Sequence, residues 1–327
     1  MTQRKLSLSL PTGLGGELNN LPVIVVEARD AGPTVAITAN VHGDEVVGVE
    51  AIHMLSRELT SSLLKGAVRL YPTLNPEGLA RANRRVPPEG QDLNRLFPGD
   101  ALGTPAERLA RVAWDDLSRS NLDLLVDLHS DSPRSIPYTI LDRAIALRGE
   151  RRHLLERRAE LLAQAAGFTT LWEYKDKQYS KYSLDRSLTG AMVNRNNVPA
   201  FTIEAGPRLY SPIETVTMVH EAVMRVLRAL KMVEAPGLSD HHDSALDDGP
   251  WRRAPGPRAS VAGLLVPLAE PGASLKKGEV MAEVRGVRGE RLEELMVSQA
   301  CRIIALPERS WISPGVSSGT IAVRERR

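Results

Sequence analysis

Short apolar runs, rich in Val, Ile and Leu and bounded by turn residues, recur along the first two thirds of the chain. They predict β-strands at 22–28, 34–41, 67–74, 122–128 and 200–204. Apolar residues at helical spacing predict amphipathic helices over 45–59, 105–118, 150–166 and 213–232. Strands that alternate with helices predict an α/β fold with a mixed sheet flanked by helices.

The pattern changes after residue 235. Residues 236–258 are rich in Pro, Gly and Asp, which predicts a linker or a long exposed loop. Residues 259–327 alternate short apolar runs with turns, as small all-β domains do. We therefore expect a catalytic domain over 1–235, a linker, and a small C-terminal β domain.

Composition narrows the functional class. Of 327 residues, 42% are hydrophobic, enough for a buried core, and 42 basic side chains nearly balance 40 acidic ones. Without a basic run or many aromatics, we expect no nucleic-acid partner.

Without a signal-peptide core or an apolar run of about 20 residues, we expect a cytoplasmic protein with no membrane partner. A homo-oligomer is compatible with the sequence. Because Cys301 is the single cysteine, any metal site must use His and carboxylate ligands.

A first pair of candidate metal ligands lies in the segment Asn-Val-His-Gly-Asp-Glu at 40–45. His42 follows a predicted strand and Glu45 opens the next predicted helix, so the turn between them can bring both side chains to one point. Imidazole and carboxylate are ligands that suit zinc. The turn also lies beyond the carboxyl end of a strand, where open α/β sheets bind ligands.

A third candidate ligand, His129, ends the most hydrophobic predicted strand. Asp127 lies two residues earlier and therefore projects from the same face, where it could orient a ligand. Taken alone, an HxxE pair arises often by chance, and a lone strand-end histidine is more often structural. Together, at the ends of two strands, they favour a metal site with His42, Glu45 and His129 as ligands.

Two further polar elements complete the candidate site. Glu204 ends another short apolar strand; it is either an ion-paired strand-end residue or the base that takes a proton from metal-activated water. The Pro- and Gly-broken loop 83–99 carries four polar side chains suited to gripping a carboxylate or stabilising an oxyanion: Arg84, Arg85, Asn94 and Arg95.

These motifs resemble a known family. HGDE, NPEG, RRVPPEGQDLNRLFPGD, DLHS and FTIEAG occur in the order found in the succinylglutamate desuccinylase/aspartoacylase branch of the zinc carboxypeptidases. The resemblance spans about 34–206. It implies a zinc-carboxypeptidase-like fold and one Zn²⁺ ion per chain held by His42, Glu45 and His129. It also implies Glu204 as base and proton shuttle.

The resemblance further implies substrate-binding residues. Asn94 and Arg95 correspond to a pair that binds a substrate carboxylate. An arginine upstream polarises the scissile carbonyl; the count back from DLNR favours Arg85, which we take as the catalytic arginine, and the count forward from NPEG favours Arg84. Arg195 is a weaker match to a further substrate-binding arginine.

The sequence thus predicts a zinc-dependent amidohydrolase acting on an N-acyl amino acid or a similar small amide that carries a carboxylate. Two alternatives remain: a metallocarboxypeptidase acting on short peptides, and a non-catalytic zinc-binding protein. In aspartoacylases a tyrosine of the C-terminal domain lies near the substrate, whereas this chain has no tyrosine after Tyr210. N-acetylaspartate is therefore a doubtful substrate.

Overall fold

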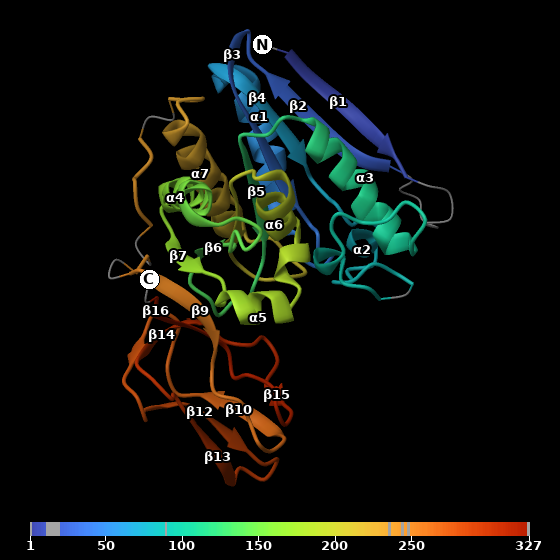
Figure 1. The fold of residues 1–327 in the computed structure, drawn as a ribbon. Helices are drawn as coiled ribbons and strands as arrows, with labels where there is room; N and C mark the ends of the chain where they lie inside the picture. Colours follow the sequence, from blue (N-terminus) through green and yellow to red (C-terminus); the bar gives the residue numbers. More distant parts are fainter. Residues whose placement is uncertain are drawn as a thin grey trace.

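The computed structural model describes residues 2–10, 20–88, 90–234, 237–242, 245–246 and 249–325. They form an α/β unit built on a large mixed sheet, from which a smaller antiparallel β unit extends at the C-terminal end (Figure 1). Twelve strands form the large sheet in the order β1-β2-β4-β3-β5-β8-β6-β7-β9-β16-β14-β11, and four form the small one in the order β13-β12-β10-β15.

The strands of the large sheet come from both ends of the chain. They are β1 (Thr2–Ser9), β2 (Asn20–Glu27), β3 (Asp30–Ala39), β4 (Lys65–Tyr71), β5 (Leu124–His129), β6 (Tyr138–Leu141), β7 (Thr169–Trp172), β8 (Ala200–Glu204), β9 (Trp251–Pro255), β11 (Ser274–Leu275), β14 (Cys301–Ala305) and β16 (Thr320–Arg324). The small sheet contains β10 (Gly263–Pro267), β12 (Val280–Arg285), β13 (Arg291–Met296) and β15 (Trp311–Ile312).

Helices cover both faces of the large sheet. The described helices are α1 (Val47–Ser62), α2 (Pro76–Ala80), α3 (Pro105–Arg119), α4 (Gly149–Ala165), α5 (Asp176–Lys181), α6 (Leu188–Ala191) and α7 (Ile213–Ala229), with the short turns η1 (Leu93–Arg95), η2 (Leu184–Arg186) and η3 (Met192–Asn196). One apolar core lies between the sheet and α1, α4 and α7. A second lies between the opposite face and α3 and α6. This two-faced burial explains why β5 is buried along its whole length.

The centre of the sheet positions the candidate site. Strands β3, β5 and β8 are parallel neighbours, so their carboxyl ends meet at one edge. His129 and Glu204 are directly paired residues at the ends of β5 and β8. The turn after β3 carries His42 and Glu45. Residues more than 150 positions apart in sequence therefore meet at this edge.

The α/β prediction is confirmed. Each of the five predicted strands and four predicted helices has a counterpart whose ends differ by a few residues. Glu45 lies two residues before α1 rather than opening it. The pattern missed β1, β6 and β7. Among the described residues, no helix is both long and apolar enough to cross a membrane.

The C-terminal third departs from the expected arrangement. Strand β9 lies inside the segment 236–258 that we expected to be a linker, and it pairs with β7 in parallel and with β16 antiparallel. Trp251 and Ala254 of this strand are buried, so burial of apolar side chains compensates for the flanking prolines and glycines. β9 thus joins strands from the N-terminal and C-terminal parts of the chain into one continuous sheet. It also reaches the edge of that sheet where the candidate site lies.

Candidate metal centre and substrate pocket

The turn that carries the first two candidate ligands is held by Asn40. This residue is fully buried and adopts a left-handed conformation, with φ of 55°, which asparagine tolerates better than most residues. Its side-chain amide donates to the carbonyl oxygens of His42, Gly43 and Glu45 at 3.0, 3.1 and 3.0 Å. Its own oxygen accepts from the Thr73 hydroxyl at 2.7 Å. One side chain therefore fixes the path of the backbone between the two ligands.

Close backbone packing explains the glycine between the ligands. A Cβ atom added to Gly43 would lie 2.1 Å from the carbonyl carbon of Gly78 and 2.5 Å from the backbone oxygen of Asn83. Gly78 belongs to the short helix α2, whose N-terminus is capped by Asn75. The NPEG segment thus forms a platform against which the ligand-bearing turn packs.

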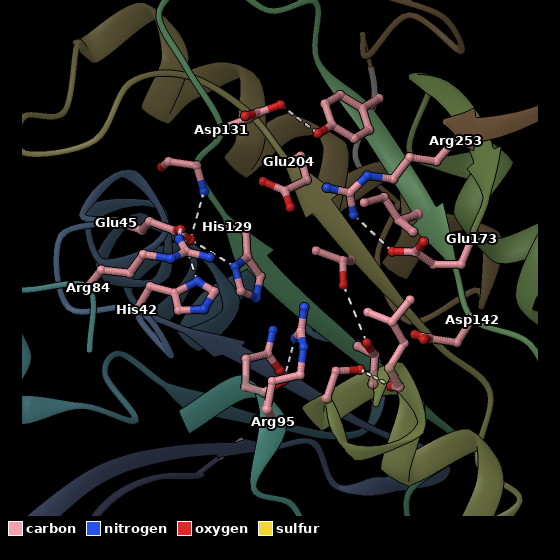
Figure 2. A pocket seen from close by; sticks show the side chains of 18 of the residues that line it. His42, Glu45, Arg84, Arg95, His129, Asp131, Asp142, Glu173, Glu204 and Arg253 are labelled. Atoms are coloured by element: carbon pink, nitrogen blue, oxygen red, sulfur yellow. Dashed lines mark hydrogen bonds and ion pairs between the residues drawn. The ribbon is translucent and has the colours of Figure 1, made fainter. Parts of the chain in front are cut away.

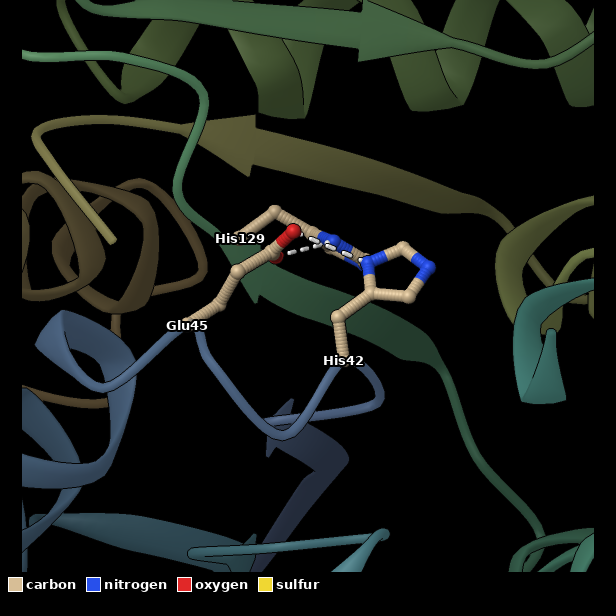
Figure 3. A group of neighbouring side chains, drawn as sticks. All are labelled: His42, Glu45 and His129. Carbon is tan, nitrogen blue, oxygen red and sulfur yellow. Dashed lines mark hydrogen bonds and ion pairs between the residues drawn. The ribbon is translucent and has the colours of Figure 1, made fainter. Parts of the chain in front are cut away.

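Three buried side chains converge at the edge of the sheet (Figure 3). The Glu45 carboxylate lies between two imidazoles, with Oε1 3.0 Å from Nδ1 of His42 and Oε2 2.8 Å from Nδ1 of His129. One ligand atom from each residue lies within 4.8 Å of the others. Two imidazole nitrogens and a carboxylate are a donor set that catalytic zinc sites use.

The outward nitrogens of both imidazoles also have carboxylate partners. Nε2 of His42 lies 3.1 Å from Oδ1 of Asp92, and Nε2 of His129 lies 2.8 Å from Oδ2 of Asp127. Asp127 in turn accepts a 2.6 Å hydrogen bond from the Thr38 hydroxyl. Metal-binding histidines usually donate their second ring N–H in this way. With Nε2 occupied, each ring offers Nδ1 to a metal, so these residues fit a zinc ion.

The charges within the cluster stabilise one another. Burial raises the pKa of Glu45, but the two imidazoles outweigh it and hold this pKa well below its usual range. Burial lowers the pKa of His129, yet Asp127 and Glu45 raise it well above the ordinary value. Without a metal, the buried carboxylates therefore favour protonated imidazoles; a metal ion bound by Nδ1 would take the place of the proton there and supply the same positive charge to Glu45.

Glu204 lies beside this cluster without joining it. It ends β8, paired with His129 of β5 on one side and with Tyr138 of β6 on the other. Among the described residues its carboxylate has no hydrogen-bond partner. Burial raises the pKa of Glu204 to about 7, with the His129 charge opposing. A carboxyl group with a pKa near neutrality can both accept and return a proton.

The cluster opens into a cavity of about 370 Å³. Figure 2 shows the three candidate metal ligands and Arg84 on one side of the cavity. Asp142, Glu173 and Arg253 lie on the other side, and Glu204 lies between the two groups. Asn94 and Arg95 also line the cavity, as predicted for substrate-binding residues. Their loop is held by Phe97, which is fully buried.

The two adjacent arginines are oriented differently. Nη1 of Arg84 lies 2.6 Å from Oε1 of Glu45, and the side chain lines the cavity. Arg85 is exposed, lies outside the cavity lining and donates to the backbone oxygen of Gly90 at 2.8 Å. The structure therefore brings Arg84 to the site, and not Arg85, which the count back from DLNR favoured.

Arg195 also lies away from the site, exposed in η3. An arginine that the sequence did not single out, Arg253 of β9, lines the cavity instead and pairs with Glu173, its Nη1 2.9 Å from Oε1. Tyr138 and Asp142 of the β6 region line it too. The segment around Arg253 is rich in prolines and glycines and shows no alternation of apolar and polar residues, so the sequence offered no local signal for this strand.

The match to a known protein family covers the region that carries these motifs. Residues 31–230 match the family model described as the succinylglutamate desuccinylase/aspartoacylase catalytic domain. The chain is 37% identical over 110 residues to the N-alpha-acetyl-L-2,4-diaminobutyric acid deacetylase of Halomonas elongata, covering 34% of this chain and 32% of that protein. It is 39% identical over 118 residues to the succinylglutamate desuccinylase of Pseudomonas paraeruginosa, covering 34% and 35%. These matches span about a third of the curated relatives.

Solved structures share the fold over nearly the whole chain. A succinylglutamate desuccinylase/aspartoacylase from Rhodobacter sphaeroides superposes with a TM-score of 0.80 at 22% identity, covering 99% of this chain and 96% of that one. The product-bound ectoine utilization protein EutE (DoeB) from Ruegeria pomeroyi has a TM-score of 0.78 at 20% identity, covering 98% and 95%. At these identities the likeness establishes the fold, including the C-terminal β unit.

Proposed function

The chain belongs to the succinylglutamate desuccinylase/aspartoacylase family, and on that premise we propose that it is a zinc-dependent hydrolase of N-acyl amino acids. The bond cleaved is the amide between the acyl group and the amino acid. The observation that carries the proposal is the buried His42–Glu45–His129 cluster, which opens into a cavity beside Glu204. A zinc-binding protein without turnover needs no proton acceptor beside the metal.

Zinc held by His42, Glu45 and His129 would supply Lewis acidity, which lowers the pKa of a water molecule and polarises the amide carbonyl. Glu204 takes a proton from the attacking water and later delivers it to the leaving amine. Its burial suits both steps, and so does a carboxylate that forms no hydrogen bond with the residues the structure describes. The Arg84 guanidinium stabilises the oxyanion that develops as the carbonyl is attacked.

Asn94 and Arg95 bind the carboxylate of the substrate. The Asn94 side-chain oxygen accepts a 2.8 Å hydrogen bond from the backbone N–H of Leu188, which orients its amide group in the cavity. Arg95 donates to the backbone oxygen of Asn94 at 2.6 Å and has no carboxylate within ion-pair distance among the described residues. A guanidinium without an acidic partner in a cavity is suited to a carboxylate ligand.

The test is hydrolysis by the purified, zinc-loaded protein of a panel of N-acetyl amino acids, N-succinyl amino acids and N-blocked dipeptides. Release of free amine is measured, with the Glu204→Gln variant as the inactive control. We expect the acyl amino acids to be cleaved with a higher kcat/KM than the dipeptides. A preference for dipeptides would make the protein a carboxypeptidase, and no hydrolysis of any member would refute the proposal.

A further inference from the structure

One side of the cavity is bordered by an arginine that follows the proposed base. Arg208 lines the cavity and lies four residues after Glu204, in the loop that follows β8. This loop is tied to the turn that carries the first two metal ligands, because the backbone N–H of Leu209 donates to the backbone oxygen of Asp44 at 2.7 Å. The backbone at Arg208 is therefore held beside the metal cluster.

Glu308, in the loop between β14 and β15, holds this arginine. Its Oε2 lies 3.1 Å from Nη2 of Arg208, and its Oε1 lies 3.5 Å from the backbone nitrogen of the same residue. Only 28% of the Arg208 side chain and 27% of the Glu308 side chain are exposed. The pair is thus partly shielded from water, and it connects the C-terminal third of the chain to the rim of the cavity.

The loop that carries Glu308 is fixed on its other side to the segment that follows β5. The backbone N–H of Leu306 donates to the backbone oxygen of Arg134 at 2.9 Å, and the backbone oxygen of Leu306 accepts from the Ser132 hydroxyl at 2.7 Å. Asp131, the neighbour of Ser132, lines the cavity. The loop after β14 therefore links the segments that follow β5 and β8, and the three together close this side of the cavity.

The closed side lies opposite the residues that are proposed to bind the substrate carboxylate. In Figure 2, Asp131 and Arg95 lie on opposite sides of the pocket, with the candidate metal ligands and Glu204 between them. A substrate whose carboxylate binds at Arg95 and whose amide lies beside Glu204 extends its acyl group toward Asp131. The Arg208–Glu308 pair therefore lies on the acyl side.

We propose that the Arg208–Glu308 ion pair limits the length of the acyl group that the protein accepts. A longer apolar chain has to lie against the guanidinium group or separate it from Glu308, and both removals, from water or from the partner charge, are costly. A short acyl group ends before it reaches the pair. The cavity volume of about 370 Å³ is near the lower end of the range of about 300–1,000 Å³ for small-molecule sites. This inference rests on the proposed deacylase function and assigns the residues that set its acyl specificity.

The experiment compares the N-acetyl, N-butyryl and N-hexanoyl derivatives of the amino acid whose N-acetyl form the zinc-loaded protein cleaves best. We expect kcat/KM to fall at least about 10-fold from acetyl to hexanoyl, since one methylene group in a confined site changes kcat/KM by about 10- to 200-fold. Arg208→Ala opens the rim and should raise the hexanoyl-to-acetyl ratio of kcat/KM at least about 10-fold. Equal cleavage of the three derivatives by the wild type, or the wild-type ratio in Arg208→Ala, would overturn the inference.

A second variant tests the pair rather than the single side chain. Glu308→Ala releases the guanidinium group of Arg208 from the rim and should also raise the hexanoyl-to-acetyl ratio. Because the two residues act as a unit, the double variant should have about the ratio of Arg208→Ala alone and not the product of the two single effects. A Glu308→Ala protein with the wild-type ratio would contradict the role assigned to the pair.

Arg134→Ala is the matched control. It breaks another ion pair with the C-terminal third, in which Nη2 of Arg134 lies 3.7 Å from Oε1 of Glu270, and Arg134 does not line the cavity. This variant should keep the wild-type hexanoyl-to-acetyl ratio. A ratio raised as much as in Arg208→Ala would mean that general loosening between the two parts of the chain, and not the pair at the rim, determines acyl length.

A binding measurement separates this inference from the proposed function. If no acyl amino acid is cleaved, the proposed function is wrong, and calorimetry with N-acetylglycine and N-hexanoylglycine then decides the inference. The hexanoyl-to-acetyl ratio of affinities should be at least about 10-fold higher for Arg208→Ala than for the wild type. Equal ratios in the two proteins, or no binding of either compound, would refute the assignment of the pair.

Discussion

The Oδ2 atom of Asp127 lies 2.8 Å from Nε2 of His129, and the two residues occupy the same face of the central strand β5. Because successive side chains of a strand alternate between faces, the two-residue spacing is what brings them together. The contact leaves Nδ1 of His129 to face Glu45 and the metal position. Asp127 is fully buried and is itself held by Thr38. It thus sets the orientation of a candidate ligand.

This contact predicts the effect of Asp127→Asn. The amide keeps the size of the side chain but loses the charge that orients and polarises His129, so zinc affinity should fall about 10- to 100-fold. Competition with a metal chelator measures it. Asp30→Asn, at an exposed position, is the control and should leave the affinity unchanged. Equal affinities for wild type and Asp127→Asn would show that this carboxylate has no part in metal binding.

The two neighbouring arginines give a matched pair of variants. Arg84→Ala removes the guanidinium that lines the cavity and should lower kcat about 100- to 1000-fold, the range for loss of an oxyanion-stabilising donor. Arg85→Ala changes an exposed side chain and should stay within about 3-fold of wild type. Steady-state kinetics on the best acyl amino acid measures both. A larger loss of kcat for Arg85→Ala than for Arg84→Ala would show that Arg85 is the residue that polarises the carbonyl.

Replacement of the proposed base separates catalysis from metal binding. Glu204→Gln keeps the shape of the side chain but cannot take a proton, so kcat should fall at least about 100-fold. Zinc content should remain that of wild type, because Glu204 is outside the ligand cluster. Metal analysis and kinetics on one preparation test both statements, with the exposed Glu234→Gln as control. Activity near that of wild type would show that another group is the base.

The raised pKa of Asp142 predicts that the stability of the folded protein depends on pH. Burial raises the folded-state pKa of this carboxyl group to about 7, above the unfolded value. Between about pH 4 and 7 the folded protein retains a proton that the unfolded chain has lost, so stability falls as pH rises through this range. Asp142→Asn lacks that titrating group, so the difference in unfolding free energy between variant and wild type should shift in favour of the variant by up to about 4 kcal/mol between pH 4.5 and pH 8.

Urea unfolding of wild type and Asp142→Asn at several pH values measures this difference. Because both proteins share every other titrating group, the difference between them isolates Asp142. Tyr179→Phe retains the carboxyl group but loses the hydrogen bond that lowers its pKa, so its stability should fall with rising pH at least as much as that of wild type. A difference between Asp142→Asn and wild type that is constant from pH 4.5 to 8 would mean that Asp142 has an ordinary pKa.

The ligand cluster could be predicted because each ligand is tied to a strong local pattern. An apolar strand followed by a polar turn places His42 and His129 at carboxyl ends of strands, and a parallel sheet brings such ends to one edge. The alternation of a strand was enough to place Asp127 beside His129. Asn40 and Asp92 were missed, although both stand inside the quoted motifs, because their role appears only when the path of the turn is known.

The remaining errors have a common physical cause. The choice between Arg84 and Arg85 depends on the direction of side chains in a loop, which is fixed by contacts with Glu45 and Gly90 rather than by spacing. Strand β9 lies in a stretch of Pro, Gly and Asp, and its partners β7 and β16 are about 70 to 80 residues away on either side. Pairing over such separations leaves little trace in local composition, so Arg253 could not be placed in the cavity from the sequence.

We infer that a zinc ion held by His42, Glu45 and His129 is required for amide hydrolysis. Its most direct test is the zinc content of the purified protein, measured by mass spectrometry alongside hydrolysis of the acyl amino acid panel before chelation, after chelation and after zinc is restored. We expect about one zinc per chain, loss of hydrolysis on chelation, and recovery when zinc returns. Hydrolysis that persists in metal-free protein, or a protein that takes up no zinc, would contradict it.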